Sequence, residues 1–99
     1  IRADFAAIDA ERLADGSAGG PPDVCIHLAW SDGFAHDSPA HIDHLPQHVA
    51  FVRRLMELGV KRFAGLGTMH EIGYWEGAIN ESTPSNPRSL YGIAKTALR

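Results

Sequence analysis

The sequence has little of several features on which particular classes of protein depend. Only one of its 99 residues is a cysteine, Cys25, so an internal disulfide and a cysteine-based zinc site are both excluded. Nine Lys and Arg against twelve Asp and Glu give a net charge of -3, which argues against a basic nucleic-acid binder or a polybasic membrane anchor. No run approaches the roughly 18 to 20 apolar residues of a membrane-spanning helix. These absences favour a cytoplasmic protein whose partners are small molecules.

The apolar pattern predicts a strand, a helix and a second strand in that order. Residues 24–29 form a short apolar run between turn residues, which predicts a strand buried on both faces of a parallel sheet. Helical spacing over residues 40–58 predicts a helix whose continuous part begins near Pro46, and Gly59 favours its end. Residues 60–66 are the second predicted strand. The order predicts an α/β parallel sheet with ligands at the carboxyl ends of its strands, residues 27–31 and 65–70.

The remaining segments carry weaker patterns. Residues 1–5 resemble the end of a strand, and residues 9–14 favour one or two helical turns. Residues 15–22 contain a cluster of glycine and proline that predicts a loop. A second, much longer loop is predicted over residues 67–89, before a helix that begins near Leu90. Because loops of that length in compact domains are usually functional, we expect part of the site there.

Tyr91 and Lys95 lie four residues apart at the start of the last predicted helix, which places them on one helical face. An ammonium group about 4 to 5 Å from a phenol favours the phenolate by roughly 3 kcal/mol at an effective dielectric constant near 20. Such a tyrosine can exchange a proton with a substrate. Thr68, after the second strand, is expected to offer its hydroxyl to the same substrate oxygen. The same spacing is also typical of a surface pair on a helix.

Three histidines and the cysteine are further candidates for chemistry. The spacing of His41, His44 and His48 is compatible with a transition-metal site, but no His-Glu-x-x-His motif is present. Hydrogen-bonded or solvated histidines are favoured, and no metal is expected. Cys25 is interpreted as a small core residue rather than a reactive thiol.

The long loop leaves two alternatives open. His70 and Glu71 either face a substrate or cap and pack the loop. Tyr74 and Trp75 either stack on a base or sugar or are partly buried, and partial burial is the commoner outcome for adjacent aromatic residues.

Three segments occur in a characteristic order. Residues 22–29 read PDVCIHLA, residues 59–63 read GVKRF, and residues 80–95 read NESTPSNPRSLYGIAK. In order and spacing they resemble the fourth-strand signature, the start of the fifth strand and the DE-x-x-P-x-x-P-x-S-x-Y-G-x-x-K stretch of the extended short-chain dehydrogenases/reductases. This is the NAD-dependent epimerase/dehydratase family, whose members act on nucleotide sugars. The three matches extend over almost all of the chain, which resembles a middle fragment of such an enzyme.

The resemblance implies part of a doubly wound parallel-sheet Rossmann fold that binds NAD or NADP, without its first strands and glycine-rich loop. It implies that Tyr91 is the catalytic acid/base, that Lys95 holds the nicotinamide ribose, and that Thr68 completes the catalytic set. The implied cofactor-binding residues are Asp4, Phe5, His27, Leu28, Ala29, Tyr91 and Lys95. Residues 1–99 are therefore expected to be a partial NAD(P)-binding domain of a larger chain, inactive and not a stable domain alone.

The residues after Thr68 bear on the expected reaction. Dehydratases of the family carry Asp-Glu there, whereas this chain has Met69 and His70, which are the expected substrate residues. Because methionine carries no proton, 4,6-dehydration is disfavoured, ketoreduction of a nucleotide sugar is favoured, and epimerisation stays open. The resemblance also suggests a homodimer. The alternative is a non-catalytic dinucleotide-binding regulatory or scaffold protein on the same fold.

Overall fold

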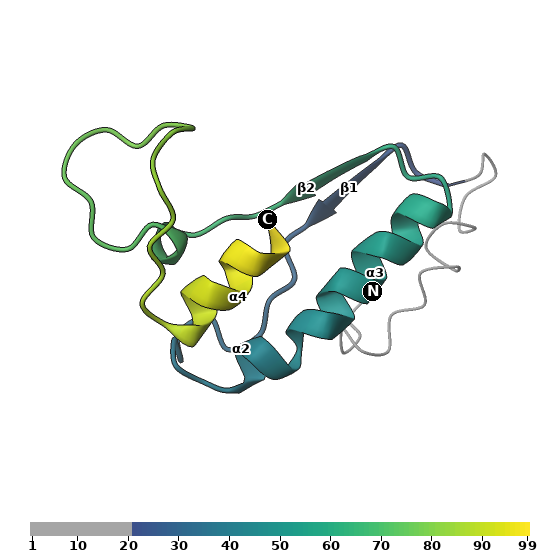
Figure 1. The fold of residues 1–99 in the computed structure, drawn as a ribbon. Helices are drawn as coiled ribbons and strands as arrows, with labels where there is room; N and C mark the ends of the chain where they lie inside the picture. The colour runs from purple at the N-terminus through teal and green to yellow at the C-terminus, as the bar shows by residue number, and fades with distance from the viewer. Residues whose placement is uncertain (1–20) are drawn as a thin grey trace. The chain divides into compact units, whose positions relative to one another are not determined.

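The computed structural model describes residues 21–99 (Figure 1). The predictions for residues 1–5, 9–14 and 15–20, and with them Asp4 and Phe5, lie outside the described residues. Contacts divide the chain into two units. The sheet unit comprises residues 21–29 and 46–66, and the α4 unit comprises residues 30–45 and 67–99. Within residues 21–99, no helix combines the length and hydrophobicity that crossing a membrane requires.

The sheet unit contains two parallel strands, as the sequence predicts. Strand β1 is Val24–His27 and strand β2 is Arg62–Gly65, with Val24 opposite Arg62 and His27 opposite Gly65. The two strands run side by side in Figure 1. The pairing continues past the strands, since Leu66 N–H donates to the His27 carbonyl at 3.2 Å. Both strands are shorter than predicted, because the regular ladder of backbone hydrogen bonds ends where the chain turns toward its loops.

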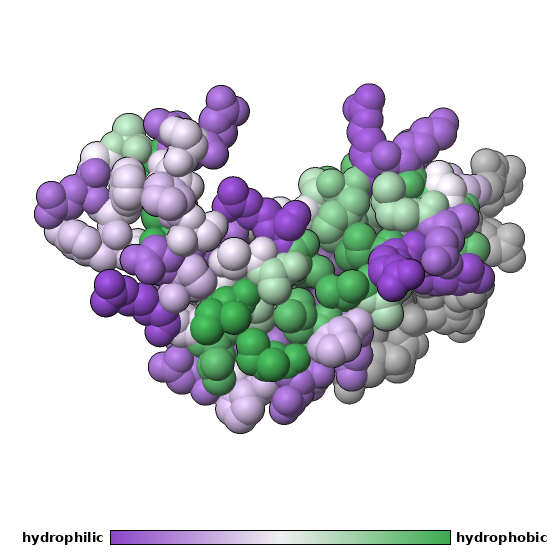
Figure 2. All heavy atoms as spheres, viewed as in Figure 1, coloured by the Kyte–Doolittle hydropathy of each residue, from purple (hydrophilic) through white to green (hydrophobic). Residues whose placement is uncertain are grey.

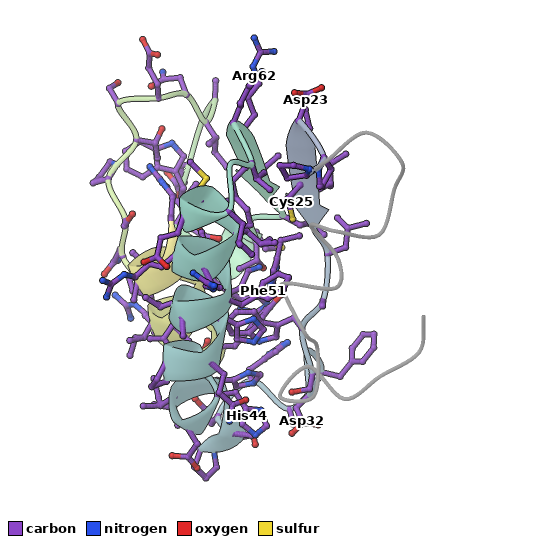
Figure 3. The ribbon with its side chains drawn as sticks, turned by 90° about the vertical axis from the view of Figure 1, so that its right-hand side faces the viewer. Asp23, Cys25, Asp32, His44, Phe51 and Arg62 are labelled. Carbon is purple, nitrogen blue, oxygen red and sulfur yellow. The ribbon has the colours of Figure 1, made fainter. Side chains whose placement is uncertain are left out.

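One face of this sheet is covered by helix α3, Leu45–Glu57. Leu55 and Val60 are each 2% exposed, and Cys25, Phe51 and Leu58 pack against them. Figure 3 labels Cys25 on β1 and Phe51 on α3, on the facing sides of the two elements. The interpretation of Cys25 as a packed residue is confirmed, and burial raises the pKa of its thiol.

The prediction that residues 24–29 are buried on both faces is wrong for the described residues. Val24 is 47% and Ile26 67% exposed. Successive side chains of a strand point to opposite faces, so these two lie on the face away from α3, whereas Cys25 and His27 lie toward it. An apolar run therefore indicates the strand but not the number of covered faces.

Helix α3 begins where Pro46 predicts, because proline is tolerated in the first turn of a helix, where its missing N–H has no intrahelical partner. A separate short helix, α2 (Ala40–Asp43), precedes it. Gly59, at φ 103°, follows the helix and reverses the chain toward β2. The buried residues of α3 are Leu55 and His48, whereas Met56, which the spacing assigns to the apolar face, is 47% exposed.

His48 is buried through a polar contact that the apolar pattern does not reveal. Its Nδ1 lies 3.0 Å from Nε2 of His27, and the two imidazole rings meet edge to face. The histidines are 3% and 4% exposed. A shared proton satisfies one ring nitrogen of each residue, which allows two histidines to occupy the interface between β1 and α3.

The α4 unit is built from α2, a short 3₁₀ helix η2 (Met69–Glu71) and helix α4 (Leu90–Leu98). The sequence predicts loop throughout residues 67–89, and η2 is the exception. Ser89 caps α4 by accepting a hydrogen bond from Gly92 N–H at 3.1 Å, so the helix begins where predicted. Figure 2 shows hydrophobic surface over α4 and α2. Ile42 of α2 is 39% exposed and Ile93 of α4 is 45% exposed.

Candidate functional site

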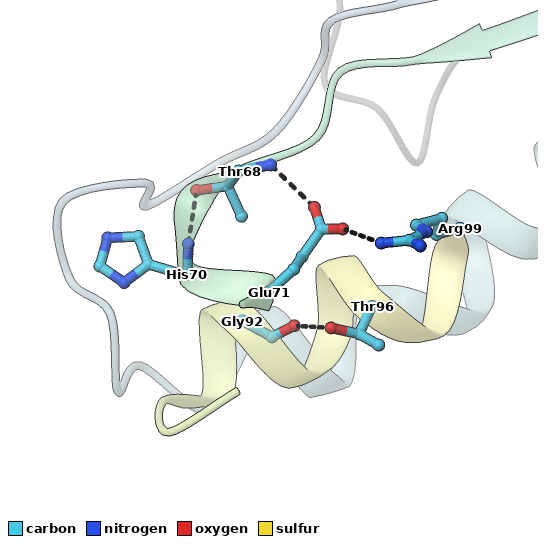
Figure 4. A network of polar contacts seen from close by, with 6 residues as sticks. All are labelled: Thr68, His70, Glu71, Gly92, Thr96 and Arg99. Carbon is cyan, nitrogen blue, oxygen red and sulfur yellow. Dashed lines mark hydrogen bonds and ion pairs between the residues drawn. The ribbon is translucent and has the colours of Figure 1, made fainter. Parts of the chain in front are cut away.

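Thr68 is held at the start of η2 by a capping box. Its hydroxyl oxygen accepts a hydrogen bond from His70 N–H at 3.4 Å, and the Glu71 carboxylate accepts one from Thr68 N–H at 2.8 Å (Figure 4). Glu71 is 4% exposed and also lies 3.7 Å from Nη1 of Arg99. Of the two alternatives for Glu71, facing a substrate or capping and packing the loop, the structure shows the second.

Tyr91 lies in the first turn of α4 within a group of aromatic side chains. Its ring stacks with His36 at 5.8 Å between centroids and is tilted against His41 at 5.1 Å and His70 at 5.5 Å. Trp30 lies 6.2 Å away, again between centroids. The Tyr91 N–H also donates to the His36 carbonyl at 2.8 Å. These contacts fix the ring at several points around its edge and face.

Lys95 is one turn beyond Tyr91 and is only 7% exposed. Its Nζ lies over the indole of Trp30, 4.7 Å from the ring centroid. Burial lowers the pKa of Lys95, and the negative charge of Glu71 opposes that shift. Within residues 21–99 its ammonium has no carboxylate partner within ion-pair distance. The site thus contains a poorly solvated positive charge held chiefly by an aromatic face.

The α4 unit therefore brings together five of the predicted site residues, which are Thr68, Met69, His70, Tyr91 and Lys95. Close packing of backbone accounts for part of this, because a Cβ placed on Gly92 would lie 2.3 Å from the His70 carbonyl oxygen. Only glycine allows α4 to approach η2 so closely. The element that carries Thr68 and the element that carries Tyr91 are thereby in direct contact.

Three of the predicted cofactor residues lie in the sheet unit, at and just after the end of β1. His27 is 4% exposed and is bonded to His48. Leu28 is 65% exposed, and Ala29 is also exposed. The two residues that follow β1 are thus exposed in the described structure, at the carboxyl end of a parallel strand.

A surface pocket of about 380 Å³ lies beside η2. It is lined by Met69, His70, Gly73, Tyr74, Trp75 and Ile79. Met69 is 73% exposed, as a residue available to substrate would be. Tyr74 is 78% exposed, so the expected partial burial of the adjacent aromatic residues is wrong for this residue. Trp75 is 43% exposed. Both instead form part of the pocket wall.

The three histidines considered as metal ligands have different partners. His41 contacts Trp30 and Ala35, His44 Nδ1 lies 3.3 Å from the Ser31 hydroxyl, and His48 contacts His27. Within the described part of the chain, no three His, Cys, Asp or Glu side chains are grouped as a metal site would need.

Sequence reasoning did not assign Trp30, His36 and His41 to this site, although all three contact Tyr91 and Trp30 also contacts Lys95. The only signal was position, since Trp30 lies in the segment after the first strand where ligands are expected. His36 and His41 follow in an irregular stretch and a four-residue helix, neither of which has an apolar period that predicts which side chains face inward.

Comparison with known proteins places these features in context. No family model matches the sequence. The chain is 49% identical, over 74 residues and 75% of its length, to dTDP-6-deoxy-L-talose 4-dehydrogenase (NAD(+)) of Aggregatibacter actinomycetemcomitans. It is also similar to the solved structure of RMD from Pseudomonas aeruginosa complexed with NADPH, at 21% identity and a TM-score of 0.71 over 99% of the chain.

The chain spans 27% of the length of that relative and 35% of that solved chain. The structural similarity confirms the predicted fold class, an α/β chain that forms part of a Rossmann fold. The relative and the fold together confirm the resemblance of this chain to a fragment of the extended short-chain dehydrogenase/reductase, or NAD-dependent epimerase/dehydratase, family.

Proposed function

We propose that this chain is part of an NAD(P)-dependent oxidoreductase that reduces a ketone on a nucleotide-activated sugar or, in reverse, oxidises the corresponding alcohol. One arrangement carries the proposal. Thr68 is fixed at the start of η2, Tyr91 and Lys95 are one turn apart on α4, and the two elements pack together at Gly92. The 49% identity to a sugar-nucleotide dehydrogenase supports this reaction class.

Tyr91 would give its phenolic proton to the ketone oxygen as that oxygen gains negative charge. Thr68 would donate a hydrogen bond to the same oxygen. Its hydroxyl oxygen already accepts from His70 N–H, and this leaves the hydroxyl hydrogen as a donor. Two donors on one oxygen stabilise the charge that develops in the transition state. In the oxidative direction the same groups act in reverse, and Tyr91 takes the proton from the alcohol.

One observation supports the fit of these residues to a dinucleotide cofactor: Lys95 is a nearly buried residue whose ammonium lies over the Trp30 ring. This charge would stabilise a phenolate at Tyr91 and donate hydrogen bonds to ribose hydroxyls. Leu28 and Ala29, which are exposed residues, would line the cofactor by their backbone, and residues 4 and 5 remain proposed contacts on its adenine side. When bound, the nicotinamide supplies or accepts the hydride.

The pocket beside η2 is the proposed entrance of the sugar. Met69 and His70 form part of its wall, and the first of these has no proton to exchange. Hydride transfer assisted by Tyr91 needs no further acid or base on that wall, whereas elimination of water from the sugar does. Met69 stands where dehydratases of the family carry an aspartate, so we propose ketoreduction over dehydration, and NAD and NADP remain equal candidates.

We also propose that residues 1–99 belong to a larger NAD(P)-binding domain, because the chain spans 27% of its relative. The 99 residues alone are expected to be inactive. A homodimer is proposed from the family resemblance, and a cytoplasmic location from the mild acidity and the single cysteine.

The test uses the complete gene product that contains this segment. Oxidation of NADH and NADPH is followed by absorbance with a dTDP-4-keto-6-deoxyhexose as substrate, for the unchanged protein and for Tyr91→Phe. We expect kcat to fall by about 10² to 10⁴ in the variant, because the general acid is lost. Binding of the reduced nicotinamide, measured by fluorescence, serves as the control for folding.

Equal turnover by the unchanged protein and Tyr91→Phe would contradict the role of Tyr91. Tight binding of dinucleotide by a protein that turns over no ketosugar in either direction would instead favour the non-catalytic dinucleotide-binding alternative.

A further inference from the structure

The indole of Trp30 links two residues of the α4 unit. Its Nε1–H donates a hydrogen bond to Nδ1 of His41 at 3.0 Å, and the face of its ring carries the Lys95 ammonium, 4.7 Å from the centroid. An ammonium is attracted by the quadrupole of an indole, and the attraction is stronger where water is scarce. Lys95 is 7% exposed, so the contact is made with little competing water.

His41 is fixed in one tautomer by its two partners. Its Nε2 lies 2.8 Å from the carbonyl oxygen of Ala35, which can only accept, so Nε2 carries the hydrogen. The Trp30 indole nitrogen can only donate, so Nδ1 is the bare acceptor. His41 is 2% exposed, and both of its ring nitrogens are hydrogen-bonded, one of them to the backbone. Rotation of this ring would break both bonds.

The Lys95 side chain needs such an anchor. A lysine stem has four rotatable carbons, and its ammonium is a compact charge without the fixed geometry of a guanidinium. Within residues 21–99 no carboxylate forms an ion pair with Lys95, since the Glu71 carboxylate is engaged by Thr68 N–H and Arg99. The indole face is the contact that defines where the charge lies.

We propose that Trp30 and His41 are positioning residues for Lys95: His41, anchored on the Ala35 carbonyl, fixes the plane of the Trp30 indole, and the indole fixes the ammonium. The inference rests on the proposed function, in which Lys95 supplies the positive charge of the catalytic site. Neither residue needs to touch substrate or take part in proton transfer.

The first test measures the position of Lys95 without reference to activity. In the complete gene product with ¹³C-labelled lysine, the ring current of Trp30 should shift the terminal methylene protons of Lys95 upfield, and Lys95→Met identifies the resonance. His41→Phe keeps the ring volume but removes the acceptor, and it should move this resonance toward the position of a free lysine. Phe34→Leu is the control, because Phe34 is an aromatic residue of the same unit that is fully exposed, and it should change nothing.

The absence of an upfield resonance in the unchanged protein would overturn the contact, and an unmoved resonance in His41→Phe would overturn the role of His41. Trp30→Phe is the second variant if His41→Phe fails to fold. This variant keeps the His41 bond to Ala35 and an aromatic face but loses the indole N–H that donates to His41, so we expect an intermediate shift of the Lys95 resonance. A resonance at the position seen in the unchanged protein would contradict the role of this hydrogen bond.

The second test separates positioning from a general structural role. His41→Phe should raise the KM for the reduced nicotinamide roughly tenfold, as a misplaced binding group does. The same substitution should have little further effect in a Lys95→Met background, because His41 acts through that residue. Equal effects in both backgrounds would overturn the proposal. If the protein turns over no nucleotide sugar, the proposed function fails while the resonance test still decides the positioning of Lys95.

Discussion

The carboxylate of Glu71 accepts a hydrogen bond from the backbone N–H of Thr68 at 2.8 Å and thereby closes the capping box that opens η2. The same carboxylate is 4% exposed and faces the Arg99 guanidinium at 3.7 Å. It links the proposed hydroxyl donor to the end of α4, the helix that carries Tyr91 and Lys95. Glu71 is therefore important for the geometry of the site although it is not assigned a chemical step.

Glu71→Ala should destabilise the protein by about 1 to 3 kcal/mol, because the partly buried Thr68 N–H loses a charged partner. Glu71→Gln keeps an acceptor oxygen and should cost less than half as much. Urea unfolding of the complete gene product measures both. Glu81→Ala, which removes an exposed carboxylate in the same unit, is the control and should lie within about 0.5 kcal/mol of the unchanged protein. Equal stability of the Ala and Gln variants would contradict the capping role.

Thr68→Val should lower kcat/KM by roughly 10² to 10³, because it removes a donor to the developing oxyanion. Thr68→Ser keeps the hydroxyl and should retain activity within a few-fold. Both are compared by steady-state kinetics with the same ketosugar. The valine variant also loses its cap, which costs about 1 kcal/mol of stability, so its rate is measured well below its unfolding temperature. A valine variant as active as the serine variant would show that the hydroxyl is not used.

Local signals explain the parts of the fold that the sequence predicts. Pro46 and Gly59 bound α3, and Ser89 caps α4, because caps and breakers act within a few residues. The Thr68-x-x-Glu71 spacing is also a local signal, and it could have assigned Glu71 to the capping box.

The remainder depends on contacts between distant residues. Lys95 lies on Trp30, 65 positions earlier by number, and His27 meets His48 across β1 and α3. Neither pairing follows from period or propensity, because each depends on how the elements pack. The exposure of Ile26 has the same origin, since an apolar run does not tell which faces of a sheet are covered.

Gly92→Ala should destabilise the protein by about 1 to 3 kcal/mol. Its Cβ would lie 2.3 Å from the His70 carbonyl oxygen and 3.1 Å from Pro87, so α4 must move away from η2. Such a movement separates Tyr91 from Thr68, and kcat should fall with stability. Gly33→Ala is the matched control, because a Cβ there meets nothing within 4 Å. Thermal unfolding and kinetics of the two variants measure the difference, and an unperturbed Gly92→Ala protein would contradict the close approach of the two elements.

The stability of the protein should also carry a pH signature of Lys95. Burial lowers its pKa below the ordinary value of 10.5, so the folded protein releases this proton at a lower pH than the unfolded chain does. Between the two pKa values the unfolded chain binds more protons, and stability due to this residue therefore rises with pH across that window. Lys95→Met lacks the titrating group, whereas all other groups that titrate there are present in both proteins. Urea unfolding at neutral and alkaline pH should show the unchanged protein gaining stability relative to Lys95→Met as the pH approaches the ordinary lysine value. A difference that stays constant, or that shrinks with rising pH, would mean that Lys95 is as well solvated in the folded protein as in the unfolded chain.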